Sequence, residues 1–534
     1  MRPQLEATGP AAAETELTNR DLTNCDREPV HVPGAIQPHG VLLVLAEPDL
    51  RIRQVSASLR PHIGLNPAAM VGQKLALLLD DPSFESVLGC LTENLTEPHY
   101  LPPLITSTGR RFEALIHRTA DGLILELEPH NDNSTLDVAR IIRDTLAEVH
   151  RAPTLIAVCQ VAAERLRALT GFDRVMVYRF RPDDAGAVIA EARREDLSPY
   201  LGLTYPATDI PRQVRHLFLL NPLRVRKGNE EAVSPLVPPL NPATGEALDM
   251  SRCALRATSP VHLEYLRNMG VSASMTLSIV QEGRLWGMFA CHHVEAKYVP
   301  HAHRLACQAL GHLLAMQIMA KQQAEETAGR LRSHDWLLGA LPAVAGSTCL
   351  TEALLRLGPS LPGVVNADGV VIRSGAGTVT FGATPYPGHL NGGQLNGGQL
   401  NGEQLDGLIA WLRREHPVGV FATSALGQQF PPAGAFAGLA SGILALPLSA
   451  DGGDWILWCR GELVRTVSWA GDPRKSAPDQ ANGGRISPRE SFAAWAEAVR
   501  GQSEPWTAAE IGFVQSLHGA LLSVVAGWNG HAGS

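Results

Sequence analysis

The pattern of apolar and polar positions divides the chain into three stretches, each mixing predicted strands with predicted helices. In the first stretch, Pro67–Leu79 is typical of short helices and lies between strand candidates. Asp121-Gly122 is a hairpin signal between two of these strands. The apolar runs and alternations predict strands at Val41–Leu45, Arg51–Val55, Arg111–Ile116 and Leu123–Leu127. The pattern of this stretch of about a hundred residues therefore predicts strands, then short helices, then further strands.

The second stretch is a larger α+β unit. Residues 136–169 have a helical pattern with one break at Pro153. A further helix is predicted at Pro211–Leu220, and Val233–Asn241 is Pro- and Asn-rich, with little regular structure expected. Strands are predicted at Phe172–Phe180, Gly186–Ala192, Leu277–Val280 and Leu285–Cys291. Val30–Gly40, before the first unit, holds two prolines and two glycines and is expected to be irregular.

The last third begins with a proline-free segment, Arg304–Leu338, whose apolar spacing predicts a rigid helical connector. An Asn-Gly-rich repeat within His389–Gly407 is typical of a flexible loop. Residues 471–487, after the predicted strands, are polar and contain proline and glycine, and a less polar segment begins again at Pro488. This pattern predicts a long hairpin-like arm that projects from the unit. Two strands, Trp455–Arg460 and Val464–Trp469, and a terminal helix, Ala508–Ala526, complete this unit.

Composition restricts the class of protein. The 534 residues are too many for one core, and two to four domains are expected. The net charge of −8 gives no basic footprint for nucleic acid. No apolar run reaches a membrane span, and no secretory h-region is visible, so we expect a cytoplasmic protein. The eight cysteines are scattered without a C-x-x-C pair, which argues against a disulfide framework and a zinc site.

Candidate chemistry lies in the middle unit. Thr204–Pro211 places Asp209 between Pro206 and Pro211, which favours a stiff loop that presents a carboxylate; by itself it also fits an ordinary solvated loop. Arg224 and Arg256 could neutralise two carboxylates of a ligand, since guanidinium forks suit carboxylates. Taken singly, each also has a purely structural interpretation, and for Arg224 alone a surface side chain is favoured over a ligand contact.

Other polar residues give no sign of catalysis. Thr258, Ser259 and His262 follow Arg256 closely, and His292 with His293 ends a strand. Adjacent strand residues point to opposite faces, so the two histidines do not predict a metal site. No phosphate-loop, H-E-x-x-H or G-x-S-x-G motif occurs, and no kinase or cyclase signature. No helix N-terminus is evident at Cys25 to activate it as a nucleophile. We therefore predict no catalytic residues, no metal and no enzymatic activity.

Several longer motifs resemble those of bacterial phytochromes. The family's N-terminal region is matched by Cys25–Pro29 with Ile36–Gly40, and its P-A-S-D-I-P loop by Pro206–Pro211, with Thr208 in place of Ser. Further matches are Leu255–Met269, Trp286–His293 and the PRxSF-like Pro488–Phe492. Two positions depart from the pattern: Ala470 in the usual W-G-G, and Gly461 where Pro is common.

The resemblance implies an α+β fold of three consecutive sensor domains, PAS, GAF and PHY, each an antiparallel sheet with helices, joined by a long helix. It implies an N-terminal arm at 1–25, PAS at 26–130, GAF at 131–325 and PHY at 326–534, with a tongue at about 455–492 and a C-terminal helix. It also implies a knot, in which the segment around Ile36 threads a loop of the GAF domain.

The resemblance further implies a linear tetrapyrrole. Relatives that attach it through a GAF cysteine do so just before the histidine matching His262, where this chain has Val261, so Cys25 points to biliverdin IXα as the cofactor. The main-chain carbonyl of Asp209 and His262 are then expected beside the pyrrole nitrogens, and His292 at the ring D carbonyl. The remaining implied contacts are Ile210, Pro211, Tyr178 and Tyr205 around the rings, Arg224, Arg256, Thr258, Ser259 and Ser274 toward the propionates, and Arg489 as a tongue contact.

The function implied is a red/far-red photoreceptor that binds biliverdin covalently and converts between the Pr and Pfr states by ring D isomerisation. The alternative is a PAS–GAF sensor of another ligand or of redox state that has lost light sensing. A homodimer is expected; the helical connector is a candidate interface, but its heptads are too irregular to assign the contact to it. Only a short Gly-rich tail follows the last predicted helix, so output would pass through a separate partner or through a module removed from this chain.

Overall fold

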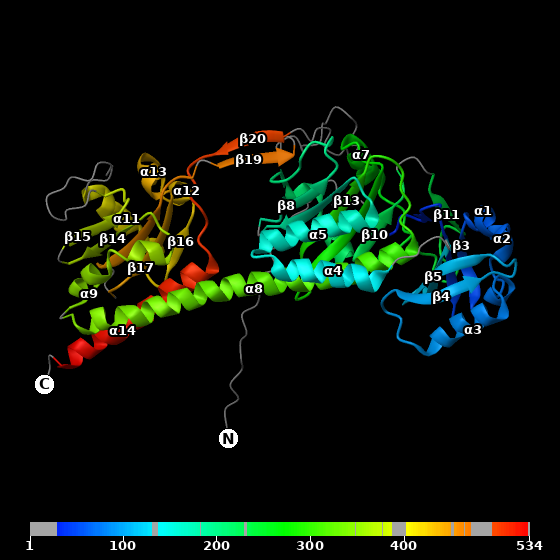
Figure 1. Ribbon diagram of the computed structural model, residues 1–534, viewed down its shortest axis with the longest axis horizontal. Helices are drawn as coiled ribbons and strands as arrows, with labels where there is room; N and C mark the ends of the chain where they lie inside the picture. The colour runs from blue at the N-terminus through cyan, green and yellow to red at the C-terminus, as the bar shows by residue number, and fades with distance from the viewer. Residues whose placement is uncertain are drawn as a thin grey trace, which may run out of the picture. The chain divides into compact units, whose positions relative to one another are not determined.

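The computed structural model describes residues 29–130, 137–181, 183–228, 232–347, 349–375, 377–386, 402–449, 453–463, 465–470 and 494–531. The chain divides into two compact units. The first comprises residues 1–319 with 468–495, and the second comprises residues 320–467 with 496–534. Mixed helices and largely antiparallel sheets recur in three domains along the chain, which confirms the predicted α+β class (Figure 1).

The N-terminal domain is built on a seven-stranded sheet in the order β1-β11-β3-β2-β6-β5-β4. Its interior face packs on three short helices through a single apolar cluster that includes Leu43, Val55 and Phe112. The strands are β1 (Ala35–Ile36), β2 (Val41–Ala46), β3 (Arg51–Ser56), β4 (His99–Ile105), β5 (Arg111–Thr119), β6 (Gly122–Pro129) and β11 (Ser234–Val237). The helices are α1 (Leu59–Ile63), α2 (Pro67–Met70) and α3 (Asp81–Gly89), with 3-10 turns at Leu75–Leu77 and Cys90–Thr92.

Two segments predicted to be irregular form strands of this sheet. Ala35 pairs with Pro235 and Ile36 with Ser234, so β1 and β11 support each other although nearly two hundred residues separate them. Both segments contain prolines, so local propensity does not predict strands there. Each strand is stabilised by a partner that is distant in the sequence, and a local pattern cannot show this. Ile36 also bridges Arg256 on its other side, and Gln37 N donates to Leu255 O at 2.8 Å. The threading of a knot stays a prediction.

The middle domain contains an eight-stranded sheet in the order β10-β12-β13-β7-β8-β9-β19-β20. Its strands are β7 (Arg174–Phe180), β8 (Gly186–Arg193), β9 (Thr204–Tyr205), β10 (Leu223–Arg226), β12 (Ala273–Gln281), β13 (Arg284–His293), β19 (Arg465–Ala470) and β20 (Ala494–Val499). The helices are α4 (Val138–Arg151), α5 (Leu155–Thr170), α6 (Arg212–Leu220) and α7 (Pro260–Asn268), with a 3-10 turn at Ala207–Asp209. The helical break predicted at Pro153 lies between α4 and α5.

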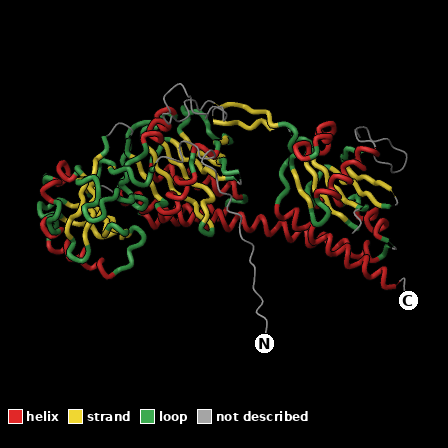
Figure 2. Tube along the Cα trace, turned by 180° about the vertical axis from the view of Figure 1, so that it is seen from behind, coloured by secondary structure: helices red, strands yellow, loops and turns green. Residues whose placement is uncertain are grey.

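One face of this sheet is apolar and packs on α4, α5 and the start of α8 (His301–Ala345), as Figures 1 and 2 show from opposite sides. Alternate residues such as Val175, Val177, Leu277 and Phe289 enter this core. Because side chains alternate between the faces of a strand, the residues between them point to the other face. That second face carries the predicted site.

The projecting arm reaches the sheet of the middle domain through its first strand. β19 runs parallel to β9, with Trp469 opposite Thr204. This pairing places the described part of the arm beside the strand that leads into the Pro206–Pro211 loop. Residues 471–493, including Arg489 and the PRxSF-like motif at Pro488–Phe492, lie outside the described residues, as do Cys25 and the N-terminal arm.

The second unit is organised around a five-stranded antiparallel sheet in the order β15-β14-β18-β17-β16. Helix α8 is longer than predicted at 45 residues, and its part beyond residue 319 belongs to this unit. The strands are β14 (Gly369–Ser374), β15 (Gly377–Gly382), β16 (Phe421–Thr423), β17 (Gly442–Pro447) and β18 (Trp455–Arg460). The helices are α9 (Leu350–Leu357), α10 (Leu361–Val364), α11 (Gly402–Glu415), α12 (Leu426–Gln429), α13 (Ala437–Ala440) and α14 (Ala508–His531), with a 3-10 helix at Pro431–Phe436.

The position of β18 corrects the predicted start of the tongue. All six of its residues are buried, and it pairs with β14 on one side and β17 on the other. Trp455 and Trp458 alternate between the two apolar clusters on opposite faces of the sheet. A central strand buried on both faces belongs to the core, so the projecting arm begins after Arg460.

Candidate functional site

The site is built on the face of the middle sheet that points away from α4 and α5. Arg226, Ser274, His292 and Arg174 are successive cross-strand partners in one row. Tyr178 and Arg224 lie on the same face because they are two or four residues from members of that row. The apolar alternation that buries one side of the sheet therefore gathers polar and aromatic side chains on the other.

An aromatic and aliphatic wall occupies one end of this face. The rings of Tyr178 and Tyr205 lie 5.7 Å apart, and that of Phe180 lies 5.3 Å from Tyr178. Ile210, Phe218 and Tyr265 pack against the same cluster, so α6, α7 and the proline loop all contribute to it. The structure thus brings together Tyr178, Tyr205 and Ile210. Tyr205 is 4% exposed, and its Oη has no hydrogen-bond partner among the described residues.

Glycine residues make room for this wall. A Cβ added to Gly186 would lie about 2 Å from ring atoms of Tyr178, and one added to Gly287 would lie 2.4 Å from Tyr178 O. Real Cβ atoms do not approach other atoms so closely. Gly186 therefore leaves room for the ring of Tyr178, and Gly287 leaves room for its backbone.

The proline loop presents Asp209 toward α7. Thr204–Tyr205 forms the short strand β9, Ala207–Asp209 makes one 3-10 turn, and Pro211 is the N-cap of α6. Asp209 Oδ2 accepts a hydrogen bond from Tyr265 Oη at 3.1 Å. The stiff loop expected from its two prolines is present, and its carboxylate is fixed to a neighbouring helix.

Helix α7 positions His262 beside Tyr265. Ser259 caps the helix, its Oγ accepting from His262 N at 3.3 Å, and Thr258 immediately precedes this cap. His262 and Tyr265 are three residues apart and therefore share a helix face. Their rings are nearly parallel, with centroids 6.0 Å apart. Tyr265 was missed as a site residue, although it lies within the Leu255–Met269 motif at this spacing from His262.

Both histidines of the site favour the neutral form. Desolvation by surrounding protein, followed by the charge of Arg226, lowers the pKa of His262 to about 4. His262 nevertheless remains exposed to solvent. Burial, followed by the charge of Arg174, lowers the pKa of His292 to about 3. Neutral imidazoles can both donate and accept hydrogen bonds, as contacts with a polar ring system require.

Guanidinium groups gather at the other end of the face. Arg224 Nη1 donates to Cys253 O at 3.2 Å and Ala254 O at 3.1 Å, and its Nη2 donates to Arg256 O at 3.0 Å. Arg256 is 6% exposed, and its Nη1 has no hydrogen-bond partner among the described residues. Burial lowers the pKa of both groups, and for Arg224 the charge of Arg256 adds to the effect.

The N-terminal domain supplies the acid that holds the Arg256 loop. Glu126, on β6, is 2% exposed and accepts from Ala254 N at 3.0 Å and Leu255 N at 2.6 Å. Burial raises the pKa of its carboxyl to about 7, despite these two hydrogen bonds. Glu126 was not predicted from the sequence, because nothing local links β6 to a loop 128 residues later.

The arrangement suits an elongated, partly conjugated molecule with negatively charged groups at one side. Its apolar part would fit the Tyr178–Tyr205 wall, its polar ring atoms would face His262 and Asp209, and its acidic groups would neutralise the guanidinium groups. An unpaired buried guanidinium is costly, so Arg256 is the strongest local sign of an anionic ligand. Cys25, the predicted attachment point, lies outside the described residues and stays a prediction.

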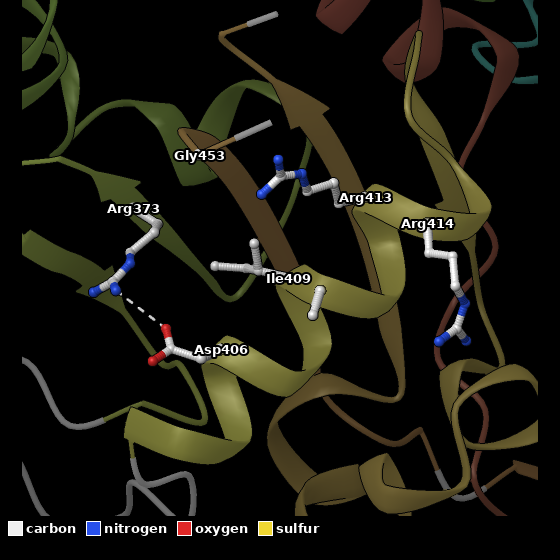
Figure 3. Close-up of a pocket in the computed structure, with 7 residues that line it drawn as sticks. Arg373, Asp406, Ile409, Arg413, Arg414 and Gly453 are labelled. Atoms are coloured by element: carbon white, nitrogen blue, oxygen red, sulfur yellow. Dashed lines mark hydrogen bonds and ion pairs between the residues drawn. The ribbon is translucent and has the colours of Figure 1, made fainter. Parts of the chain in front are cut away.

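A second pocket lies in the other unit and has a different character. It is lined by Arg373, Asp406, Ile409, Ala410, Arg413, Arg414 and Gly453 (Figure 3). Arg373 Nη2 lies 3.1 Å from Asp406 Oδ1, whose side chain is 60% exposed. Arg413 and Arg414 are also exposed. Solvated surface side chains of this kind do not define a ligand.

Among the described residues, no three His, Cys, Asp or Glu side chains come together as a metal-binding group. None of the described helices has a stretch long and apolar enough to cross a membrane.

Comparisons with known proteins agree with this architecture. Three family profiles match the chain in succession: a PAS fold at residues 25–130, a GAF domain at 154–320 and a phytochrome region at 341–529. Cyanobacterial phytochrome B of Nostoc sp. PCC 7120 is 36% identical over 95% of this chain and 66% of its own length. A bacteriophytochrome of Xanthomonas campestris is 35% identical over 93% of this chain and 78% of its own length.

Solved structures show the same likeness. The Stigmatella aurantiaca phytochrome photosensory core module aligns with a TM-score of 0.80 and 35% identity, covering 95% of this chain and 99% of that one. Bacteriophytochrome RpBphP3 of R. palustris aligns with a TM-score of 0.81 and 35% identity. The chain spans about two thirds of the length of the first curated relatives it matches.

Proposed function

Because this chain belongs to the phytochrome family and has its PAS–GAF–PHY photosensory architecture, we propose that it is a red/far-red photoreceptor that binds biliverdin IXα covalently. The observation that carries the proposal is the polar face of the middle sheet. It combines an aromatic wall, two neutral imidazoles, and buried guanidinium groups of which Arg256 lacks a partner for Nη1. Biliverdin has matching parts: conjugated rings, pyrrole nitrogens and two propionates.

The residues on this face have distinct roles in the proposal. Bound biliverdin supplies light absorption and a double bond about which its ring D turns. Tyr178 and Tyr205 enclose that ring and exclude water from it. The Asp209 carbonyl accepts from the pyrrole nitrogens, and His262 lies beside them. His292 donates to the ring D carbonyl, which its low pKa permits because a neutral imidazole keeps one N–H.

The acidic side of the ligand faces the charged end of the site. Arg224 and Arg256 neutralise the propionates, and Thr258, Ser259 and Ser274 add hydroxyl donors. Ile210 and Pro211 pack near the pyrrole rings. Cys25 would hold the chromophore as a thioether, its thiol adding S and H across a vinyl double bond of ring A so that nothing is released.

The relay proposed for the signal uses the arm and the helices. Asp209 lies in the loop that follows β9, and its contacts would change with the orientation of ring D. β19, the described start of the arm, pairs with β9, which supports a route from the loop to the arm. Conversion between Pr and Pfr would then act on α8 and α14. Homodimerisation along α8 and output through a separate partner or a further module are part of the same proposal, and the proposal assigns the chain no enzymatic step.

An assembly experiment tests this function. The purified chain is mixed with biliverdin, its absorption spectrum is recorded, and a denaturing gel is stained with zinc. We expect a sharpened long-wavelength band and zinc-dependent fluorescence at the protein band. A spectrum equal to that of free biliverdin would reject bilin binding and favour a sensor of another ligand or of redox state.

A further inference from the structure

The outer face of the N-terminal sheet carries two acids side by side. Glu113 on β5 and Glu128 on β6 are cross-strand partners, and they point away from the apolar core that Phe112 and Ala114 enter. Both carboxylates are nearly buried, with 14% and 10% of the side chain exposed. Like charges directly opposite each other in a sheet are destabilising, so this pair needs compensating positive charge.

The first turn of α8 supplies that charge. Arg304 Nη1 donates to Glu128 Oε1 at 2.7 Å. His301 Nε2 lies 3.6 Å from Glu113 Oε2. The ring of His301 also packs edge-on against Tyr100 of β4, with ring centroids 4.9 Å apart. Charged and aromatic contacts therefore dock the start of α8 on β4, β5 and β6.

The two acids differ in how their charge is compensated. Glu128 faces a permanent cation. Burial would raise the pKa of its carboxyl, but the charge of Arg304, followed by His39 at 3.5 Å, lowers this pKa, so Glu128 stays ionised in mild acid. Glu113 is paired with two imidazoles instead: its Oε1 accepts from His130 Nδ1, and its Oε2 faces His301. Imidazoles carry charge only when protonated, so the charge balance at Glu113 depends on pH.

One carboxylate compensates one imidazolium but not two. A single proton taken up by His130 or His301 brings these two groups and Glu113 to neutrality. A second proton leaves positive charge uncompensated in a nearly buried contact. Burial lowers the pKa of His301; Glu113 and Glu128 oppose this shift, whereas Arg304 and His130 add to it. Docked α8 therefore resists protonation of His301.

We propose that the contact of His301 with Glu113 and Tyr100 is a proton-sensitive joint, which docks the start of α8 on the N-terminal domain at neutral pH and releases it in mild acid. The joint lies outside the proposed ligand site, so this inference does not rest on bilin binding. The ionisable groups that face His301 come from each element packed around it: Tyr100 on β4, Glu113 on β5, Glu128 on β6, His130 after β6 and Arg304 on α8 itself.

The direction of the pH effect follows from the environment of docked His301. In the released state the imidazole is solvated and takes its ordinary pKa of about 6.5. Because the pKa is lower in the docked state, docking is fully favoured above about pH 6.5 and is lost progressively as pH falls below it. One histidine can raise the released population at most about tenfold between pH 7.5 and 5.5, and we expect about fivefold.

Amide hydrogen exchange of the full chain measures this release. Exchange is followed by mass spectrometry in peptides covering 305–312, and each rate is divided by the intrinsic rate at the same pH. The corrected exchange of the wild type should be about fivefold faster at pH 5.5 than at pH 7.5. His301→Gln cannot gain charge and should lower this ratio below about twofold. His312→Gln, at an exposed position of the same helix, is the matched control and should keep the wild-type ratio.

Glu113→Gln provides a second test that does not depend on whether His301→Gln folds. Without the carboxylate, the imidazolium of His301 loses its compensation, so exchange should accelerate at a higher pH than in the wild type. A contact with a merely structural role would instead give faster exchange at both pH values and an unchanged ratio. The same ratios are expected with and without bound biliverdin. A wild-type ratio near one, or a wild-type ratio retained in His301→Gln or Glu113→Gln, would overturn the proposal.

Discussion

At the residue scale, the site depends on a few side chains whose surroundings determine their charge. Buried Glu126 holds the loop that carries buried Arg256, and the surroundings of His262 and His292 lower the pKa of both imidazoles. Arg256, His262 and His292 were named as candidate site residues from the sequence. Glu126 was not, because its hydrogen-bond partners are backbone nitrogens of a distant loop.

Cys25 gives a direct residue-scale prediction. Cys25→Ala should still hold biliverdin in the site, because the polar and aromatic contacts remain, but should lose it on a denaturing gel. Zinc-stained fluorescence at the protein band measures the covalent bond. A Cys349→Ala variant is a suitable control, since Cys349 is an exposed cysteine of the second unit. Fluorescence persisting in Cys25→Ala would show that another cysteine carries the bond.

His117 predicts a pH dependence of stability. Its side chain is fully buried, and burial followed by the charge of Arg252 lowers its pKa to about 4, opposed by Asp249; Cys253 Sγ lies 3.8 Å from its Nε2. Below pH 6.5 the unfolded chain takes up a proton that the folded chain accepts only near pH 4. Stability therefore falls as pH falls through this window, by about 2 kcal/mol between pH 7.5 and 5 for this one group.

The measurement compares urea unfolding at pH 7.5 and 5 for the wild type and His117→Asn. The variant is expected to lose about 2 kcal/mol less over this interval, whatever its stability at pH 7.5. His150→Asn, on the exposed side of α4, serves as the control and should behave as the wild type. Equal losses in the wild type and His117→Asn would contradict a neutral buried imidazole.

At the element scale, hydrophobic alternation predicted the elements with strong local patterns and missed those held by distant partners. β2, β7, β8 and β18 follow apolar runs and were found close to their observed bounds. β1, β10 and β11 are two to four residues long and form only because other strands pair with them. Arg224 was named from the sequence, but the strand β10 that carries it was missed, so Arg226, two residues further on the same face, was missed as well.

Glu126 tests the coupling between elements of the two N-terminal domains. Glu126→Gln leaves one side-chain oxygen to accept from the backbone nitrogens of residues 254 and 255. The amide nitrogen that replaces the second oxygen is a donor, so one of these two backbone hydrogen bonds is lost. Loss of one buried hydrogen bond to a charged group costs about 1.5–3 kcal/mol. We expect a lower unfolding midpoint for the first unit and weaker biliverdin binding, because Arg256 loses its support.

A nearby carboxylate gives the matched comparison. Glu113→Gln changes an acid on β5 of the same sheet that does not contact the 253–256 loop; its side chain lies beside His130 and His301. It should leave the dissociation constant for biliverdin unchanged. Glu126→Gln and Glu113→Gln proteins with identical affinity would show that β6 does not position the site.

At the scale of the whole molecule, the domain series could be predicted because long motifs occur in one order along the chain. The position of the arm could be predicted only in part: its first strand pairs with β9, whereas β18 proved to be a core strand. Sequence patterns do not distinguish a buried central strand from the base of a projecting hairpin, since both are apolar and of strand length.

The arm predicts a latch between Asp209 and Arg489. Asp209 contacts Tyr265 in this structure, and Arg489 lies outside the described residues. A buried charge that loses its partner is destabilised by several kcal/mol, so the pair would favour fully formed or fully released states. Arg489→Ala and Asp209→Ala should each assemble with biliverdin but convert incompletely under red light or revert faster in darkness. Wild-type yield and reversion rate in both variants would reject the latch.

The central claim is that this chain is a light-switched bilin protein, and a difference spectrum after alternating illumination tests it most directly. The biliverdin-loaded protein is exposed to saturating red light and then to far-red light, and absorption is recorded after each exposure. We predict that one long-wavelength band falls as a second, shifted band rises, and that the second illumination reverses the change over repeated cycles. A loaded protein whose spectrum stays the same under both colours, or only bleaches, would contradict the account.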